Sequence, residues 1–275
     1  MDAILNLISK GMNITEINFE AIKELARKAG AAILEIYNQA NDFEIEQKSD
    51  DSPITKADKI SNEIICKGIE SLNLGYPIIS EENLQTPFEV RKNYKRFWLI
   101  DPLDGTKEFI KRNGDFTVNI ALIEDKRPIA GFIYTPCTDE LFWGIKGQAA
   151  YYEQNNVVQR LNAAEFDIKN EGLRVVASRS HLDEATLKMI EKLHNPKIFN
   201  RGSSLKFMLL AKGLADYYPR MSQTMEWDIA AAQIILEESG GKIIDHVSGQ
   251  ALEYNKESMK IPGFIACGNG NPLLF

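Results

Sequence analysis

Two stretches near the start of the chain repeat apolar residues at helical spacing. The first covers residues 19–37 and the second covers residues 57–72. Apolar positions three and four residues apart lie on one side of an α-helix. The pattern therefore predicts two amphipathic helices that pack on one core.

Runs rich in β-branched and aromatic residues come next and predict strands. These runs cover residues 76–80, 97–100, 117–124, 128–134 and 140–143. Short polar turns separate the last three, which is typical of a meander. Residues 147–168 are polar, and we expect an irregular junction there.

The second half of the chain alternates between the two kinds of pattern. Strands are predicted at residues 173–178, 216–218, 242–244 and 264–267, and helices near 183–193, 203–215 and 227–239. Sheets that alternate with helical layers predict a layered α/β (α+β) sandwich in two sub-domains. We expect residues 1–15 to form an N-terminal extension, 16–160 the first sub-domain and 161–275 the second.

Composition narrows the possible classes of protein. The 275 residues are 44% apolar, which is ample for a core. A net charge of −7 argues against binding to nucleic acid, although a few placed Lys and Arg would suffice for a small anionic ligand. The three cysteines, Cys66, Cys137 and Cys267, are far apart and odd in number. They indicate neither a disulfide framework nor a zinc site, and a reducing cytoplasm is the expected compartment.

The first ten residues are mildly apolar but lack the basic start and long apolar core of a signal peptide. No run of about 18 apolar residues is present to span a bilayer. Ile4, Leu5, Leu7 and Ile8 leave two interpretations open. The cluster packs on the protein, or it gives weak association with the cytoplasmic face of the inner membrane.

The richest chemistry lies between Asp101 and Thr106. Pro102 has no N–H group to donate, so we expect the chain to leave the sheet at Asp101. Pro102 and Gly105 favour a bend that turns the carboxylates of Asp101 and Asp104 toward one point. Two close carboxylates repel unless a cation lies between them, and Mg²⁺ prefers such oxygens together with water and substrate phosphate. An Asp-Pro turn capped by Asp104 is the alternative.

Two further acidic residues stand at the end of a strand and at the start of a helix. Glu81 follows the strand at residues 76–80, so it can share a cation with Asp101 if their strands are neighbours. Asp228 lies at the start of the helix predicted at residues 227–239. The alternatives are a solvated acidic turn for Glu81 and a helix-start carboxylate that accepts from unpaired N–H groups for Asp228.

Taken together, these segments resemble the lithium-sensitive, magnesium-dependent phosphatase superfamily that includes inositol monophosphatase and fructose bisphosphatase. The segments that resemble it are Ser80-Glu81-Glu82, Asp101-Pro102-Leu103-Asp104-Gly105-Thr106 and Trp227-Asp228, in that order. Residues 106–114, 178–181 and 202–207 are similar to the 3′(2′),5′-bisphosphate nucleotidase branch of the superfamily. The resemblance begins near Phe19 and runs almost to the C-terminus. It implies an inositol monophosphatase-like sandwich with a metal site in the first sub-domain and a nucleotide pocket in the second.

The resemblance also implies the metal ligands. Glu81, Asp101, Asp104 and Asp228 would bind two or three Mg²⁺ ions through their carboxylates, and Leu103 would bind through its backbone carbonyl. Catalytic roles are implied for Glu81, Thr106 and Asp58. Thr106 would bond the attacking water and pass on its proton with help from Asp58.

Substrate contacts are implied for Gly105, Thr106, His181, Ser203, Lys206, Arg220 and Asp228. Lys206 and Arg220 are the candidates for contact with a second phosphate. The residues alone leave other uses open. Ser203 also fits an N-cap, Lys206 a solvated residue in the first turn of a helix, and His181 a cap on the next helix.

The activity implied is hydrolysis of the 3′-phosphate of 3′-phosphoadenosine 5′-phosphate to give AMP and phosphate, a reaction linked to sulfate assimilation. An inositol monophosphatase is the alternative enzyme, favoured if Lys206 and Arg220 point away from the pocket. A non-catalytic sensor of nucleotide or Mg²⁺ is the alternative of another class. The expected partner is a small bisphosphate nucleotide, and the oligomeric state stays open.

Overall fold

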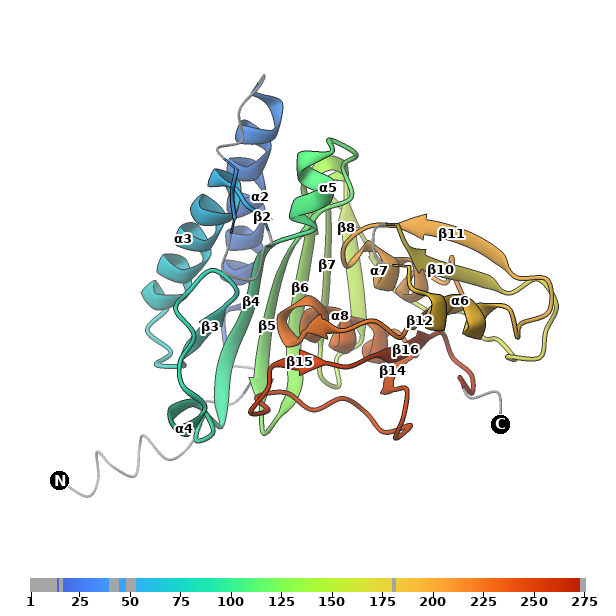
Figure 1. The fold of residues 1–275 in the computed structure, drawn as a ribbon. Coiled ribbons are helices and arrows are strands. Elements are labelled where there is room, and N and C mark those ends of the chain that lie inside the picture. The colour runs from blue at the N-terminus through green and yellow to red at the C-terminus, as the bar shows by residue number, and fades with distance from the viewer. Residues whose placement is uncertain (1–13, 15–16, 40–44, 48–52, 180–181, 273–275) are drawn as a thin grey trace.

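Two sheets with helices between and beside them form the frame of the molecule (Figure 1). The computed structural model describes residue 14 and residues 17–39, 45–47, 53–179 and 182–272. Its helices are α2 (Phe19–Asn38), α3 (Lys56–Ser71), α4 (Phe88–Arg91), α5 (Thr106–Ile110), the 3₁₀ helix η2 (Pro136–Thr138), α6 (Glu184–Ile190), α7 (Leu205–Ala211) and α8 (Glu226–Glu238). Its strands are β1 (Glu46–Gln47), β2 (Pro53–Ile54), β3 (Ile78–Ser80), β4 (Arg96–Asp104), β5 (Thr117–Glu124), β6 (Arg127–Thr135), β7 (Glu140–Ile145), β8 (Ala150–Gln154), β9 (Val157–Arg160), β10 (Arg174–Ser178), β11 (Lys197–Arg201), β12 (Tyr217–Arg220), β13 (Thr224–Met225), β14 (Lys242–Asp245), β15 (Lys260–Ile261) and β16 (Phe264–Cys267).

The larger sheet has seven strands in the order β3-β4-β5-β6-β7-β8-β9. Its neighbours pair antiparallel, apart from β3 and β4, which are parallel. Alternate residues of β5 belong to different cores. Val118, Ile120 and Leu122 pack in the core beside α2 and α3, whereas Ala121 and Ile123 pack in the core on the opposite face. The sheet is therefore a middle layer, buried on both sides.

Helical and sheet layers alternate across the molecule (Figure 1). On one face of the larger sheet, α2 contacts β5 and β6 while α3 contacts β4. On the other face, α8 contacts β4 to β7 and also reaches β14 of the second sheet. Nearly every residue of α8 is buried, because a helix between two sheets has no side left for solvent. The layered sandwich predicted from the sequence is confirmed.

The second sheet has five strands in the order β11-β10-β12-β16-β14. β10 pairs in parallel with β11 and β12, and β16 pairs antiparallel with β12 and β14. Helix α7 contacts one face of this sheet together with α8, and α6 contacts β12. The carboxyl ends of β10, β11 and β12 therefore open next to α7 and α8.

The expectation of an irregular junction at residues 147–168 is wrong. This segment contains β8 and β9, which extend the larger sheet. All four residues of β9 are exposed, and it is the last strand of the sheet. β9 has only four residues, and its two valines are adjacent and do not alternate with polar residues, so its sequence gives no strand pattern. The same reason explains why β11, also an exposed edge strand, was not predicted.

The division into two sub-domains stays a prediction, although the expected boundary at residue 160 coincides with the end of β9. The N-terminal extension and its cluster of Ile4, Leu5, Leu7 and Ile8 lie outside the described residues. None of the helices in the described part of the chain is long and apolar enough to cross a membrane.

Candidate active site

Strand pairing places Glu81 beside Asp101. In the parallel ladder of β3 and β4, Ser80 lies opposite Ile100. The backbone N–H of Glu81 then donates to the carbonyl of Ile100 at 3.1 Å. The next residues are Glu81, which follows β3, and Asp101, which lies within β4, so their carboxylates are neighbours at this end of the ladder. The two strands are neighbours, as the sharing of one cation requires.

Pro102 does not end its strand, contrary to expectation. β4 continues to Asp104, and its register against β5 shifts between Asp101, opposite Asn119, and Asp104, opposite Thr117. Three steps along β4 match two steps along β5, which makes a β-bulge. A bulge leaves one residue unpaired, so it tolerates a proline without an N–H group, and it changes the direction of the side chains around it.

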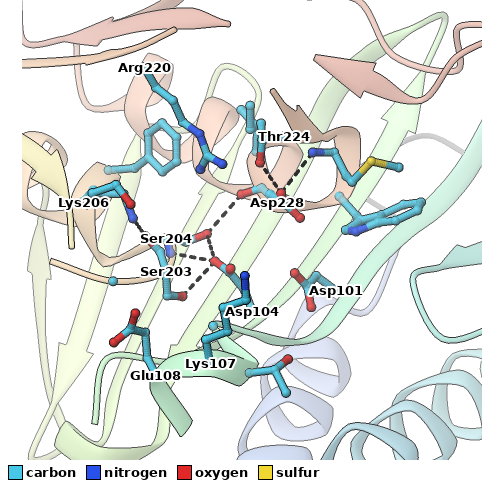
Figure 2. Close-up of a pocket in the computed structure, with 18 of the residues that line it drawn as sticks. Asp101, Asp104, Lys107, Glu108, Ser203, Ser204, Lys206, Arg220, Thr224 and Asp228 are labelled. Carbon is cyan, nitrogen blue, oxygen red and sulfur yellow. Dashed lines mark hydrogen bonds between the residues drawn. The ribbon is translucent and has the colours of Figure 1, made fainter. Parts of the chain in front are cut away.

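A cavity of about 350 Å³ opens beside this bulge (Figure 2). It lies between the end of β4 with α5 on one side and α7, β12 and α8 on the other. The predicted site residues that line it are Glu81, Asp101, Leu103, Asp104, Gly105, Thr106, Ser203, Lys206, Arg220 and Asp228. His181 lies outside the described residues. Residues separated by more than 140 positions in the sequence thus meet in one cavity.

Hydrogen bonds orient two of the carboxylates (Figure 2). Oδ2 of Asp104 accepts from Ser203 Oγ at 2.7 Å, from the backbone N–H of Ser204 at 2.7 Å and from Ser204 Oγ at 2.8 Å. Oδ2 of Asp228 accepts from Thr224 Oγ1 and from the backbone N–H of Met225. Asp228 therefore does act as a helix-start acceptor, as the alternative interpretation held, and it lines the cavity as well.

The carboxylates are crowded, and the Asp101 side chain is buried while the other three are partly exposed. Burial first, and then the charges of Glu81, Asp104 and Asp228, raise the pKa of Asp101 well above its usual range. The pKa of Asp228 is raised to about 7, by burial and then by the charges of Asp104 and Glu81. Such groups repel one another when all are ionised. A bound divalent cation removes this repulsion, so the donor set fits Mg²⁺.

The site does not form a closed metal cage. Within the described residues, no group of three Asp, Glu, His or Cys side chains is drawn together tightly enough to hold a metal ion by itself. Mg²⁺ needs no such cage, because it keeps several waters and is completed by substrate phosphate. An open, acid-lined cavity is the arrangement that this ion uses.

A hydroxyl and a buried carboxylate stand next to the acidic residues. Thr106 Oγ1 donates to Asp58 Oδ1 at 3.0 Å, and the carbonyl of Leu103 lies 3.3 Å away as a second acceptor. Asp58 is buried, and its Oδ2 accepts from both the backbone N–H (2.7 Å) and the hydroxyl (2.6 Å) of Thr55. This capping box begins α3 and fixes Asp58 for the contact with Thr106.

Gly105 is required by the turn between β4 and α5. Its φ of 94° is in the left-handed region. A Cβ atom there would lie 2.9 Å from the carbonyl oxygen of Asp115 and 3.2 Å from Cβ of Ser203. Glycine therefore allows the second half of the chain to approach the turn closely.

Two basic residues line the other end of the cavity. The side chain of Lys206 is buried, and its Nζ donates to the carbonyl of Ser203 at 2.5 Å. Burial lowers the pKa of Lys206 to about 8. Arg220 is partly exposed and donates through Nη2 to the carbonyl of Gln223 at 3.2 Å. The alternative of a solvated Lys206 is wrong, because the lysine faces a cavity and not open solvent.

The helix that follows Ser203 begins later than expected. Its N-cap is Ser204, whose side chain caps no backbone group, and Ser203 has a φ of 51°. Ser203 is therefore not an N-cap, and its hydroxyl contacts Asp104 and Thr117 instead.

Several residues of the cavity were not singled out from the sequence. They are Lys107, Glu108, Ser178, Tyr218, Gln223 and Thr224. Thr224 could have been noticed, since it lies four residues before Asp228 at the start of a helix. Lys107, Glu108 and Ser178 lie inside the recognised segments 106–114 and 178–181 without an assigned role, and no spacing marks Tyr218 or Gln223.

Comparison with known proteins identifies the family of the chain and its fold. The model of the inositol monophosphatase family matches residues 15–265. The 3′(2′),5′-bisphosphate nucleotidase CysQ of Salmonella typhimurium is 41% identical over 246 residues, which cover 89% of this chain and 97% of that protein. The crystal structure of CysQ from Bacteroides thetaiotaomicron superposes with a TM-score of 0.81 at 36% identity, covering 93% of this chain and 99% of the other. An inositol monophosphatase from Thermotoga maritima has the same fold, with a TM-score of 0.75 at 23% identity over 91% of this chain and 92% of the other.

Proposed function

The chain belongs to the inositol monophosphatase family, and we propose that within it the protein is a magnesium-dependent 3′(2′),5′-bisphosphate nucleotidase. Its substrate would be 3′-phosphoadenosine 5′-phosphate, from which it releases the 3′-phosphate. The observation on which this substrate most depends is that Lys206 and Arg220 line the same cavity as the four carboxylates. Relatives that bear the bisphosphate nucleotidase name, at 39–41% identity over about nine tenths of the chain, support the same activity.

The carboxylates of Glu81, Asp101, Asp104 and Asp228 and the carbonyl of Leu103 would hold the metal ions. All five residues line the cavity. The raised pKa values of Asp101 and Asp228 indicate that a bound cation would stabilise the ionised carboxylates. The chemistry that Mg²⁺ supplies when bound is neutralisation of the phosphate and activation of the attacking water. The number of ions, two or three, remains part of the proposal.

Thr106 and Asp58 would remove the proton from the attacking water. The Thr106 hydroxyl donates its own proton to Asp58, so a lone pair of Oγ1 is available to accept from water. As the water attacks, its proton moves to Thr106 and the threonine proton moves toward Asp58. Thr55 holds Asp58 in place through two hydrogen bonds, which keeps this relay aligned.

The basic end of the cavity would bind the second phosphate. Arg220 is the more accessible of the two cations and is the better candidate for direct contact. Lys206 lies deeper, with its Nζ 5.5 Å from the centre of the Tyr218 ring. Its ammonium group is buried, where attraction to a phosphate is stronger than in bulk water.

The two alternatives receive less support. An inositol monophosphatase would be favoured if Lys206 and Arg220 pointed away from the cavity, and both line it. A non-catalytic sensor would need no proton relay, whereas the bond between Thr106 and Asp58 is formed.

The test is release of phosphate from 3′-phosphoadenosine 5′-phosphate and from inositol 1-phosphate, side by side, with Mg²⁺ and with a chelator. We expect turnover that depends on Mg²⁺ and prefers the nucleotide. Preference for inositol 1-phosphate would overturn the assigned pocket and leave the metal site standing. Absence of turnover on both would favour the sensor.

A further inference from the structure

One short turn connects the two walls of the cavity. Residues 202–204 lie between β11 and α7, and carboxylates from the larger sheet hold the turn at two points. The backbone N–H of Ser204 donates to Asp104 Oδ2 at 2.7 Å, and the backbone N–H of Gly202 donates to Asp115 Oδ2 at 2.9 Å. Asp104 ends β4, and Asp115 lies just before β5. Figure 2 shows the Asp104 side of this arrangement.

Asp115 is a buried carboxylate with a full set of partners. It is 5% exposed. Besides the Gly202 N–H, Arg179 Nη2 lies 3.1 Å from Oδ2 and Arg201 Nη1 lies 3.6 Å from Oδ1. Arg179 follows β10 and Arg201 ends β11. A buried carboxylate is unfavourable unless it is paired and hydrogen-bonded, so these partners stabilise Asp115 while it joins β5 to the ends of β10 and β11.

The packing around Gly202 leaves little freedom. A Cβ atom on Gly202 would lie 2.9 Å from Cβ of Asp115, 3.0 Å from its carbonyl oxygen and 2.7 Å from Cγ of Glu108. The backbone of the turn therefore lies directly against Asp115. The next residue, Ser203, has a φ of 51° and donates to Asp104. A small shift at Gly202 would move the donors that orient Asp104.

We propose that Asp115 is a positioning residue for the reaction. It holds the turn so that Ser203 and Ser204 orient the carboxylate of Asp104. The same turn bears the carbonyl to which Lys206 donates. Asp115 acts through the turn and is not among the residues that line the cavity. The effect on catalysis rests on the proposed function, whereas the anchoring of the turn does not.

The chain offers a matched control. Asp216 is 6% exposed and forms an ion pair of 2.5 Å with Arg174 Nη2. Its Oδ2 also accepts from the backbone N–H of Arg174 at 2.8 Å. Like Asp115, it is a buried aspartate that joins strands, but it does not line the cavity or contact the turn at residues 202–204. Removal of the Asp216 side chain should destabilise the fold but leave KM for the substrate unchanged.

The experiment compares Asp115→Ala, Asp115→Asn and Asp216→Ala with wild type in two measurements. Hydrogen exchange in the free protein should speed up at residues 202–204 in Asp115→Ala only. KM for 3′-phosphoadenosine 5′-phosphate should rise about 10- to 100-fold in Asp115→Ala, because misplacement of a binding group by about 1 Å has that order of effect. Asp115→Asn retains an oxygen that accepts from Gly202, so it should recover much of the loss. Asp216→Ala should leave KM unchanged.

Two outcomes would overturn the proposal. One is unchanged exchange at residues 202–204 in Asp115→Ala, and the other is an equal rise of KM in Asp115→Ala and Asp216→Ala. If Asp115→Ala does not fold, the same criteria apply to Asp115→Asn with a smaller expected effect. If wild type does not release phosphate from the nucleotide, the proposed function fails, and hydrogen exchange alone decides the role of Asp115.

Discussion

The hydroxyl of Thr106 lies 3.0 Å from Oδ1 of Asp58, although 48 positions separate the two residues in the sequence. Asp58 lies in the first turn of α3, and Thr106 begins α5 shortly after the bulge in β4. The packing of α3 against β4 brings these two helix starts together. Because of this contact, the Thr106 hydroxyl can pass a proton to the carboxylate of Asp58.

Replacement of Thr106 by Val should remove this step and leave the packing intact. Val has nearly the same shape as Thr and lacks the hydroxyl. General base catalysis typically contributes about 10²- to 10⁴-fold, so we expect kcat to fall by that order while KM changes little. Steady-state kinetics with 3′-phosphoadenosine 5′-phosphate as substrate measure kcat and KM. Thr135→Val is the control, since Thr135 is a buried threonine that is not among the residues that line the cavity. A Thr106→Val enzyme with nearly normal kcat would exclude the relay.

Replacement of Asp101 by Asn should separate metal binding from folding. The change removes a negative charge from a crowded, buried site and almost no volume, so the metal-free protein should keep or raise its melting temperature. In wild type, Mg²⁺ at 100 times its Kd should stabilise the fold by about 2.7 kcal/mol, and in Asp101→Asn this gain should largely disappear together with turnover. Thermal melts with a chelator and with Mg²⁺ measure the stability of the metal-free protein and the gain from Mg²⁺. Phosphate release measures turnover. Retention of the Mg²⁺ shift and of activity would show that Asp101 is not a ligand.

Lys206 should give the enzyme an alkaline limit that depends on the substrate. Its pKa in the folded protein is lowered to about 8 from an ordinary value near 10.5 by burial. The amine is therefore charged below pH 8 and neutral above it, and only the charged form attracts a second phosphate. We expect kcat/KM for the bisphosphate to fall as pH rises through about 8, since this ratio reports the free enzyme.

The variant that checks this limit is Lys206→Met. It should raise KM for the bisphosphate about 10-fold, because a buried positive charge near the second phosphate is lost, and it should remove the alkaline fall. KM for a monophosphate should change much less. Equal effects on both substrates would remove Lys206 from the second phosphate site.

Much of the fold could be predicted from the sequence, because most elements are buried on at least one face. The strand predicted at residues 264–267 coincides with β16, and the helix predicted at residues 227–239 lies within one residue of α8 at each end. The failures occur where apolar residues neither alternate nor recur at helical spacing over enough positions. β9 and β11 are exposed edge strands, and α5 has only five residues.

The candidate site was predictable where the acidic residues follow recognisable elements. Glu81 follows β3, Asp101 lies beside it in the neighbouring strand β4, and Asp228 is in the first turn of a helix. The continuation of β4 through Pro102 was not predictable, because a bulge depends on the partner strand β5 and not on local sequence. The contact of Asp115 with Gly202 spans 87 positions, and the burial of Lys206 also depends on tertiary packing, so no local pattern indicates either.

The central claim is that this site recognises a nucleotide with two phosphates, and one pair of substrates tests it most directly. 3′-Phosphoadenosine 5′-phosphate and adenosine 3′-monophosphate have the same scissile bond and differ only in the 5′-phosphate. We predict that kcat/KM with Mg²⁺ is higher for the bisphosphate by about 10- to 100-fold in wild type, and that Arg220→Ala removes most of this difference. Equal kcat/KM values for the two substrates in wild type would contradict the account.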